Sequence, residues 1–306
     1  MIVVYNPTAG RRRSRLLWRV LDILVSNGVR LELAETRRAG HAVDLARQAT
    51  RAGGQLVVAA GGDGTVAEVA NGLAQGMRDL AGGGGHAAGG RPRLGIIPLG
   101  TANVLAHELG LPFAPREVAA ALAMSRTRLI WPGHIAGLEA DGGQTRVFVQ
   151  MLGVGFDAQV VHRLSLPLKR MFGRGAYVLQ TLRELGRYRF APISVRLDGV
   201  RTQAASVIVT KGHFYAGRYL LAPGASPVEP GFTVALFNGY GPFATMMYGA
   251  ALPLNLLPRM PGVRLVRASH IEFDGRGAPA QSDGDDVGAA PMTVTDAPGP
   301  IAVVVG

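Results

Sequence analysis

The 306-residue sequence contains no cysteine, which excludes disulfide bonds and thiolate metal sites. This absence is compatible with a reducing cytoplasm, where we expect the protein to be. The pattern GxxxxGK[ST] is missing too, which excludes a P-loop nucleotide site. The seven histidines are scattered and indicate no metal site. The first residues, 1–5, predict a strand rather than a basic and apolar signal segment.

Nucleic-acid signatures are also absent. There is no helix-turn-helix, zinc-finger or aromatic-basic pattern, and aromatic residues make up only 6% of the chain. We therefore expect no nucleic-acid partner, although the net charge is +11. That charge also suits an anionic membrane surface or a phosphorylated ligand. With 48% hydrophobic and 17% charged residues, the chain is predicted to be globular rather than disordered.

One long segment, residues 231–258, has no charged residue and is long enough to span a bilayer. Gly, Pro and Asn residues interrupt it, however, and its first part alternates in polarity as a strand does. We predict a buried strand followed by an apolar, partly helical cover. This cover, residues 243–257, and the basic and apolar segment 162–175 could touch a bilayer.

Strand and helix patterns alternate over residues 1–127, which predicts an α/β domain with a parallel sheet. Short runs over residues 128–299, several of alternating polarity, are typical of an antiparallel β-sandwich domain. The last strand, 300–306, could return to the first domain. The first domain has predicted strands at 2–5, 29–34, 56–60 and 94–98 and predicted helices at 14–26, 41–52, 102–109 and 115–124. In the second domain we expect a strand run over 145–156 and a helix over 176–185.

The segment GGDGT, residues 61–65, ends a buried strand and begins a helix with one apolar face. Its glycines permit positive φ and a close approach of another group to the backbone. The start of the helix offers N–H groups and a partial positive charge to a phosphate. Asp63 has two interpretations: it caps the helix, or a cation or sugar hydroxyl lies between it and the phosphates.

Two similar turns, NPTAG at 6–10 and PLGTAN at 98–103, follow other strands of the same predicted sheet. Ligands of parallel sheets bind beyond the carboxyl ends of the strands, where all three turns are predicted to lie. Four arginines, 11–13 and Arg15, oppose the dipole of the helix that they begin. They form a solvated charge run, or they bind phosphates or anionic lipid headgroups.

The acidic segment SDGDD at 282–286 also has two interpretations. Asp-Gly is typical of a hairpin turn, whereas phosphoryl transfer needs a carboxylate that takes the proton of the acceptor hydroxyl. The segment GVGFDA at 153–158 matches half of the dinucleotide fingerprint, but no βαβ unit surrounds it. We interpret its glycines as a bulge or a close backbone approach.

In this order, the motifs resemble the diacylglycerol kinase catalytic-domain family, which includes sphingosine kinases and bacterial lipid kinases. The resemblance covers essentially the whole chain. It is carried by NPTAG, AETRRAGHA, GGDGTVAEVANGL, PLGTANVLAHELG, GVGFDA, YLLAPGASPVEPG and SDGDD. It implies a two-domain fold: an α/β domain of the NAD kinase and diacylglycerol kinase type, and an antiparallel β-sandwich.

The resemblance implies an ATP- and Mg²⁺-dependent kinase that phosphorylates a lipid hydroxyl, such as that of diacylglycerol, in the cleft between the domains. Such an enzyme would be cytoplasmic and peripheral to the inner face of a membrane. Asp283 or Asp285 would accept the proton, and Asp285 stands where the family has Glu. The residues implied to bind ATP are Asn6, Pro7, Thr8, Ala9, Gly10, Thr36, Gly61, Gly62, Asp63, Gly64, Thr65, Val66, Ala67, Glu68, Thr101 and Asn103.

Three positions depart from the family pattern. Val104 stands where the family often has Asp, the segment around Trp131 lacks an acid, and Glu229 is only a weak metal candidate. These acids would help to hold a structural metal, so that site is in doubt. Two alternatives stay open: a NAD kinase-like enzyme, which the NPTAG and GTAN turns disfavour, and an inactive relative that binds lipid or nucleotide. Neither the acceptor lipid nor the oligomeric state follows from the sequence.

Overall fold

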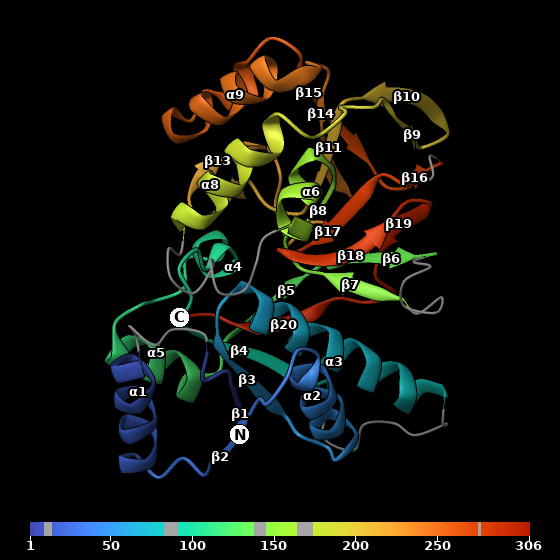
Figure 1. Cartoon of the computed structure of the whole chain (residues 1–306). Coiled ribbons are helices and arrows are strands. Elements are labelled where there is room, and N and C mark those ends of the chain that lie inside the picture. The colour runs from blue at the N-terminus through green and yellow to red at the C-terminus, as the bar shows by residue number, and fades with distance from the viewer. Residues whose placement is uncertain (9–13, 83–90, 138–144, 164–173, 275–276) are drawn as a thin grey trace. The chain divides into compact units, whose positions relative to one another are not determined.

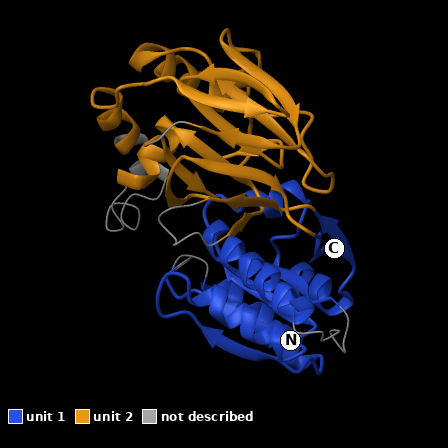
Figure 2. Cartoon of the chain, turned by 90° about the vertical axis from the view of Figure 1, so that its right-hand side faces the viewer, with its two compact units in different colours: residues 1–130, 299–306 blue, residues 131–298 orange. Residues whose placement is uncertain are grey.

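The computed structural model describes residues 1–8, 14–82, 91–137, 145–163, 174–274 and 277–306. It divides into two compact units. The first comprises residues 1–130 and 299–306, and the second comprises residues 131–298 (Figures 1 and 2). Each unit has its own hydrophobic core.

The first unit is built on a six-stranded sheet. Its strands are β1 (Ile2–Tyr5), β2 (Glu32–Glu35), β3 (Leu56–Gly61), β4 (Arg93–Pro98), β5 (Thr127–Ile130) and β20 (Ile301–Val304). The first four run parallel in the order β2-β1-β3-β4. The chain's last strand, β20, pairs in parallel with β4 and antiparallel with β5. The predicted α/β architecture with a parallel sheet is confirmed.

Helices cover both faces of this sheet. They are α1 (Ser14–Ser26), α2 (His41–Arg51), α3 (Asp63–Gly82), α4 (Val104–Glu108) and α5 (Pro115–Met124). Helices α1 and α5 pack together on one face, where Leu17 and Val118 meet Val3 and Val58 of the sheet. Helix α2 packs along α3. Because both faces are covered, β3 is an uninterrupted buried apolar run.

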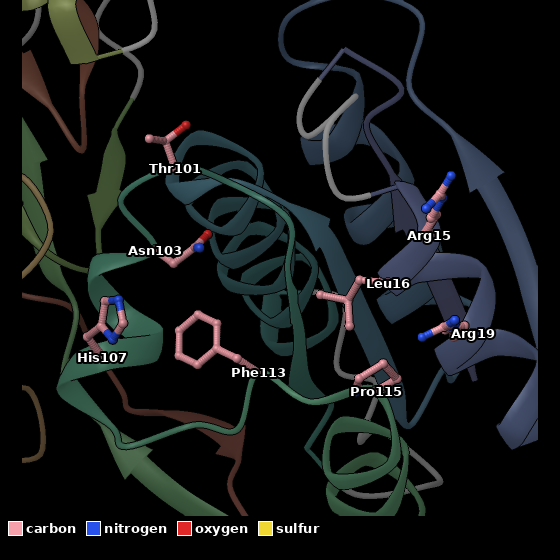
Figure 3. A pocket seen from close by; sticks show the side chains of 8 residues that line it. All are labelled: Arg15, Leu16, Arg19, Thr101, Asn103, His107, Phe113 and Pro115. Atoms are coloured by element: carbon pink, nitrogen blue, oxygen red, sulfur yellow. The ribbon is translucent and has the colours of Figure 1, made fainter.

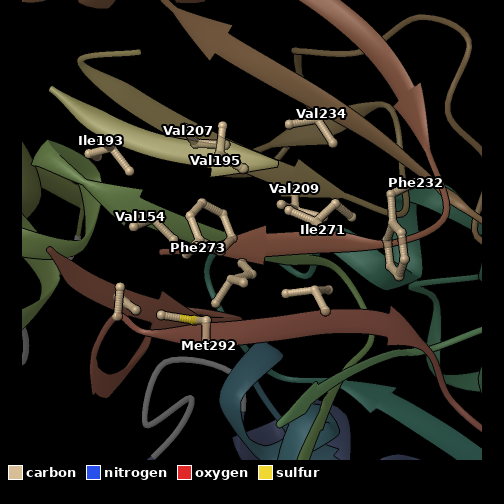
Figure 4. Packing of buried hydrophobic residues seen from close by; sticks show 14 of the residues in the cluster. Val154, Ile193, Val195, Val207, Val209, Phe232, Val234, Ile271, Phe273 and Met292 are labelled. Atoms are coloured by element: carbon tan, nitrogen blue, oxygen red, sulfur yellow. The ribbon is translucent and has the colours of Figure 1, made fainter. Parts of the chain in front are cut away.

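The second unit is an antiparallel β-sandwich, as the sequence predicts. Its strands are β6 (Gly133–Ala136), β7 (Arg146–Phe148), β8 (Met151–Gly155), β9 (Ile193–Leu197), β10 (Val200–Ala204), β11 (Ser206–Thr210), β12 (Phe214–Tyr215), β13 (Tyr219–Leu220), β14 (Phe232–Phe237), β15 (Val263–Ala268), β16 (Ile271–Phe273), β17 (Pro279–Ser282), β18 (Asp285–Ala289) and β19 (Met292–Asp296). One sheet has the order β10-β9-β16-β19-β6-β7 and the other β15-β14-β11-β8-β17-β18. Val207 and Val234 of one sheet pack against Ile271 and Phe273 of the other (Figure 4).

The helical segments of this unit are α6 (Phe156–Arg163), α8 (Arg174–Leu185), α9 (Gly241–Ala251) and the short 3-10 turns η2 (Leu252–Leu254) and η3 (Leu257–Arg259). The charge-free segment therefore forms β14, α9 and the two turns, as the sequence predicts. In the ranges that the structure describes, no helix is long and apolar enough to cross a membrane.

Several boundaries differ from the sequence prediction. The run over 145–156 is two strands, β7 and β8, because the N–H groups of residues 149–151 bond to a distant carboxylate instead of a neighbouring strand. The same run ends in α6, which the sequence analysis did not predict. Strand β2 begins later than expected because the N–H of Val29 bonds to Leu24 O at the end of α1. Helix α4 begins only at Val104 because Asn103 has φ of 47°.

We expect Gly72→Ala to separate α2 from α3. A Cβ on Gly72 would lie 2.4 Å from Val43 O and 2.6 Å from the Cβ of Ala46. The substitution should lower the free energy of unfolding by about 1–3 kcal/mol, as overpacking does. The matched control is Gly249→Ala in α9, where a Cβ meets nothing within 4 Å. It should be neutral or stabilise by up to about 1 kcal/mol. Equal denaturation midpoints for the two variants would contradict this packing.

Candidate active site

Three turns meet at the carboxyl ends of β1, β3 and β4, where the sequence places its polar and glycine-rich segments. The side-chain amide of Asn6 donates to Thr65 Oγ1 at 3.3 Å. The carbonyl of Gly61 accepts the N–H groups of Leu99 and Gly100, at 2.9 and 3.2 Å. The structure therefore brings the three sequence-predicted turns into one cluster.

Two positions in this cluster have no room for a side chain. A Cβ on Gly100 would lie 2.5 Å from the Cα of Gly62, and a Cβ on Gly61 would lie 2.3 Å from Thr65 Oγ1. These distances are shorter than any ordinary van der Waals contact. Gly100 therefore lets the turns after β3 and β4 approach backbone to backbone, and Gly61 leaves room for the side chain of Thr65.

Helix α3 begins directly after these glycines. The first N–H groups of a helix have no partner inside it, and the helix dipole adds partial positive charge there. The N–H of Val66 is bonded within the helix start, to Gly62 O at 3.1 Å. The N–H groups ahead of it, including that of Gly64, have the position and charge to bind a phosphate.

The turn after β1 is ordered by its own side chains. Thr8 donates its N–H and its hydroxyl to Asn6 Oδ1, at 3.0 and 2.9 Å. Pro7 lies between these residues and is half-buried. The predicted ATP ligands Ala9 and Gly10 lie outside the described residues, as do the arginines at 11–13.

Asp63 contacts the next helix along the chain. Its Oδ1 accepts the N–H of Val104 at 2.6 Å, at the start of α4. Burial raises the pKa of Asp63, and the N–H groups of Val104, Asn103 and Leu105 oppose that rise. Of the two sequence interpretations, the structure shows capping, but of α4 rather than of the helix that Asp63 begins.

The remaining sequence-predicted ATP ligands of this unit have structural roles. Both carboxylate oxygens of Glu68 accept backbone N–H groups at the start of α2, from Gly40 at 3.0 Å and Ala42 at 3.1 Å. Val66 and Ala67 are buried in α3. The N–H of Thr36 donates to the carbonyl of Tyr5 at 2.8 Å and extends the pairing of β1 with β2. Nucleotide contacts by these residues stay a prediction.

A pocket of about 470 Å³ opens beside the cluster, between α1 and the segment that follows β4 (Figure 3). Two predicted residues, Thr101 and Asn103, line it. The rings of His107 and Phe113 stack there, with centroids 4.8 Å apart. These two rings and Arg19 were not among the residues predicted from the sequence, since their spacing matches no recognisable motif. The other lining residues are Arg15, Leu16 and Pro115.

In the second unit, the acidic segment forms the β17–β18 hairpin turn. Asp283 and Gly284 have φ of 52° and 87°, as a type I′ turn requires. The carboxylate of Asp283 is buried and accepts three consecutive backbone N–H groups, from Val149, Gln150 and Met151, at 2.8, 2.9 and 2.9 Å. Burial raises the pKa of Asp283 to about 6, and these three bonds oppose the rise.

Asp285 and Asp286, by contrast, are partly exposed. Asp285 Oδ2 accepts from Arg146 Nη2 at 3.0 Å, and its side chain is 40% exposed. Asp286 Oδ2 lies 2.6 Å from Nδ1 of His162, on α6. Asp283 and Asp285 are the two candidate proton acceptors that the sequence predicts. The carboxylate of Asp285 is partly exposed and a substrate can reach it, whereas the carboxylate of Asp283 is bonded to the backbone of residues 149–151.

Buried polar groups surround this hairpin. Asp157, which the sequence analysis did not single out, accepts the hydroxyl of Tyr215 and the amide of Gln281, the latter at 2.8 Å. A Cβ on Gly153 would lie 2.4 Å from Asp157 Oδ2 and 2.8 Å from Gln281 Nε2, so this glycine makes room for two side chains rather than for another backbone. Within the described ranges, three buried atoms have no hydrogen-bond partner here: Arg146 Nε, Gln150 Nε2 and Ser282 Oγ.

The structural metal that the family resemblance implies does not fit these residues. Glu229 lies 3.5 Å from Arg267. The backbone carbonyls of Glu229 and Gly231 instead accept from the ammonium of Lys211, at 3.3 and 2.7 Å. Nor does any group of three or more His, Cys, Asp or Glu in the described part of the chain have the arrangement to hold a metal. The positive charge of this ammonium disfavours a metal ion beside Glu229.

The side chain of Lys211 is completely buried, and its ammonium also forms an ion pair with Asp296. Its Nζ lies 2.8 Å from Asp296 Oδ1 and 4.5 Å from the ring centroid of Phe232. Burial lowers the pKa of Lys211, and Asp296 opposes the change. A sequence signal existed, because Lys211 is one of only two lysines among 32 Lys and Arg residues. An ammonium is a compact donor that suits carbonyl oxygens better than a planar guanidinium does.

Comparisons with known proteins match both units. Residues 1–135 match the family model of the diacylglycerol kinase catalytic domain. Residues 150–305 match the model of the YegS C-terminal NAD kinase beta sandwich-like domain. The two matches include every described residue of the glycine turns and of the acidic hairpin.

Curated relatives carry kinase names. The "Probable lipid kinase YegS-like" of Chromohalobacter salexigens is 36% identical over 177 residues, which cover 57% of this chain and 50% of the relative. The diacylglycerol kinase of Bacillus subtilis is 31% identical over 228 residues, 73% of this chain and 69% of the relative. The chain thus matches about half the length of its YegS-like relatives.

Solved structures share the fold. A diacylglycerol kinase from Bacillus anthracis superposes with a TM-score of 0.68 at 18% identity, covering 100% of this chain and 96% of that one. Yeast NADH kinase in complex with NADH gives 0.52 at 13% identity, covering 100% and 83%. At these identities the likeness concerns the fold alone.

We expect the stability of the second unit to fall as pH rises from about 4 to about 6. The pKa of Asp283 rises from 3.8 to about 6 on folding, so the folded state binds more protons in this window. Ionised Asp283 therefore costs the folded state about 3 kcal/mol relative to its protonated form. Urea unfolding of the wild type and of Asp283→Asn should show this difference. Parallel pH profiles for the two proteins would contradict it.

Lys211→Met should lower the free energy of unfolding by about 3–5 kcal/mol, because it leaves Asp296 without its cation. Adding Asp296→Asn should recover part of that loss. Urea unfolding of the two single variants and the double variant measures the coupling. EDTA should leave the melting temperature of the wild type unchanged, and a fall would show that a structural metal is needed after all.

Proposed function

The chain belongs to the diacylglycerol kinase catalytic-domain family, and from that premise we propose that it is an ATP- and Mg²⁺-dependent lipid kinase. It transfers the γ-phosphoryl group of ATP to the hydroxyl of a diacylglycerol-like lipid. The observation that supports this proposal best is the cluster of three glycine-containing turns at the start of α3. Phosphoryl transfer relies on positioning and on charge stabilisation, and such a cluster supplies both.

The first unit binds the nucleotide in this proposal. The phosphates lie against the N–H groups at the start of α3, where glycines leave the backbone accessible. The adenine occupies the neighbouring pocket, where the stacked rings of His107 and Phe113 offer a flat apolar surface. Arg15 and Arg19 line the same pocket and add positive charge. Mg²⁺ enters with ATP and neutralises phosphate charge.

The acidic hairpin of the second unit supplies the proton acceptor, which we assign to Asp285. Its carboxylate is partly exposed, whereas that of Asp283 already accepts three N–H groups. Arg146 pairs with Asp285 and holds its carboxylate in one orientation. The donors Arg146 Nε and Gln150 Nε2 lack partners within the described ranges but are buried, so a polar headgroup reaches them only if the side chains around them move.

We expect Asp285→Asn to lower the rate of phosphoryl transfer by about 10²–10⁴-fold, as loss of a general base does. The assay follows labelled γ-phosphate from MgATP into a total lipid extract. Asp286→Asn is the matched control, because it removes an acid of equal exposure from the same hairpin, paired with His162 instead of Arg146. It should retain nearly full activity.

Three results would change the assignment. Full turnover by Asp285→Asn would place the base elsewhere. Phosphorylation of NAD with no labelled lipid would indicate a NAD kinase-like enzyme. A protein that binds ATP but labels neither would be an inactive relative.

A further inference from the structure

Helix α9 lies on the outside of the second unit, beside α8 (Figure 1). Its inner face packs on the sheet. The ring of Tyr248 lies 5.4 Å from that of Phe237, and its hydroxyl lies 3.1 Å from Gly239 N and 3.2 Å from Pro261 O. Ala251 is buried on the same side. These contacts anchor the helix to the unit.

The opposite face of α9 is apolar too and is exposed to water. Phe243, Met246 and Met247, spaced at i, i+3 and i+4, are 72%, 51% and 44% exposed. Leu254 and Leu256, in the turns that follow, are 67% and 45% exposed. We call these five side chains the α9 apolar face.

The α9 apolar face is unusual for a water-exposed surface. Surface helices normally carry charged or polar residues opposite their buried side. The chain has no charged residue from Gly231 to Pro258, a segment that includes all of α9. Large apolar side chains that are exposed together on one helix and its following turns mark an interaction surface.

Cations lie at the edges of this face. Arg218 is exposed in the turn between β12 and β13. Two residues further on, the N–H of Leu220 donates to Oδ1 of Asn255 at 2.8 Å, and Asn255 lies between Leu254 and Leu256 of the α9 apolar face. Arg259 is exposed at the end of η3. On β15, Arg267 is exposed but lies 3.5 Å from Glu229. Glu229 is the acid nearest to α9 in the sequence before it, and its carboxylate is paired with Arg267.

We propose that the α9 apolar face inserts into the interfacial region of an anionic lipid bilayer, with Arg218 and Arg259 contacting the headgroups. The choice of a bilayer over a protein partner rests on the proposed function, since a diacylglycerol-like acceptor resides in a bilayer. It is also supported by the chemistry of the face: apolar side chains at the centre, with cations at the rim. Apolar side chains favour burial at the acyl boundary of a bilayer, and nearby cations favour attraction to anionic lipids.

Insertion is tested with tryptophan as a local probe. Phe243→Trp is compared with Val200→Trp, an exposed apolar position, 71% exposed, in the β9–β10 hairpin. Both proteins keep the native Trp18 and Trp131, so the difference from the wild type reports on the new residue. With phosphatidylglycerol vesicles at low salt, the added emission of the Phe243→Trp protein should shift to the blue and be quenched by brominated lipid chains. The added emission of the Val200→Trp protein should do neither.

A loss-of-binding variant completes the test. Phe243→Ser with Met247→Ser should weaken partition into these vesicles by at least about tenfold, given the apolar area that it removes. Its melting temperature and its turnover on a short-chain, dispersed acceptor should match those of the wild type. Vesicle binding is measured without ATP, so a protein with no kinase activity can still pass this test.

The proposal is overturned if Phe243→Trp shows no quenching, or if the wild type does not bind anionic vesicles at low salt. It is also overturned if the wild type is a dimer that Phe243→Ser with Met247→Ser converts to a monomer while vesicle binding is absent. In that case the α9 apolar face is an interface between two copies of the chain.

Discussion

The close approach of Gly62 and Gly100 is the constraint on which the candidate site of the first unit depends. Parallel strands end at one edge of a sheet, so the turns after β3 and β4 must pass each other there. A Cβ on Gly100 would lie 2.5 Å from the Cα of Gly62, and glycine alone avoids that contact. The same approach brings Asp63, at the start of α3, to the N–H of Val104. One backbone contact thus sets where two helices begin and leaves the start of α3 open to a phosphate.

Buried charge has a comparable role in the second unit. The carboxylate of Asp283 accepts hydrogen bonds from three consecutive N–H groups at the junction of β7 and β8. The ammonium of Lys211 donates to the carbonyls of residues 229 and 231. An ion that is buried must be hydrogen-bonded or paired, and both of these are. The carboxylate of Asp283 is engaged in this way, so a neighbouring acid, Asp285, is the one that remains accessible. The ammonium of Lys211 disfavours a metal ion beside Glu229, the weak metal candidate of the sequence.

Much of the fold could be predicted from the sequence because its signals are local. The alternation of apolar runs and helical faces predicted the parallel sheet, and the hairpin at β17–β18 was one of the two interpretations of the Asp-Gly segment. The prediction of one strand run over 145–156 was wrong in detail. The carboxylate of Asp283, which separates β7 from β8, lies more than 130 residues further along the chain. Helix α6 was missed because its sequence follows a strand without a turn signal. The pocket rings His107 and Phe113 were missed because only the fold brings them to the same wall.

By itself, the sequence determined most of the strands and helices, in what order two domains follow, and where the backbone needs glycine. These properties depend on periodicity and on conformations that few residues adopt. Only the tertiary structure decided what each ionisable group does. Glu68 caps α2, Asp63 caps α4 and Lys211 pairs with Asp296, and none of these partners is a near neighbour in the sequence. The reason is physical: burial and hydrogen-bond partners set the state of a charge, and both come from residues that only folding brings together.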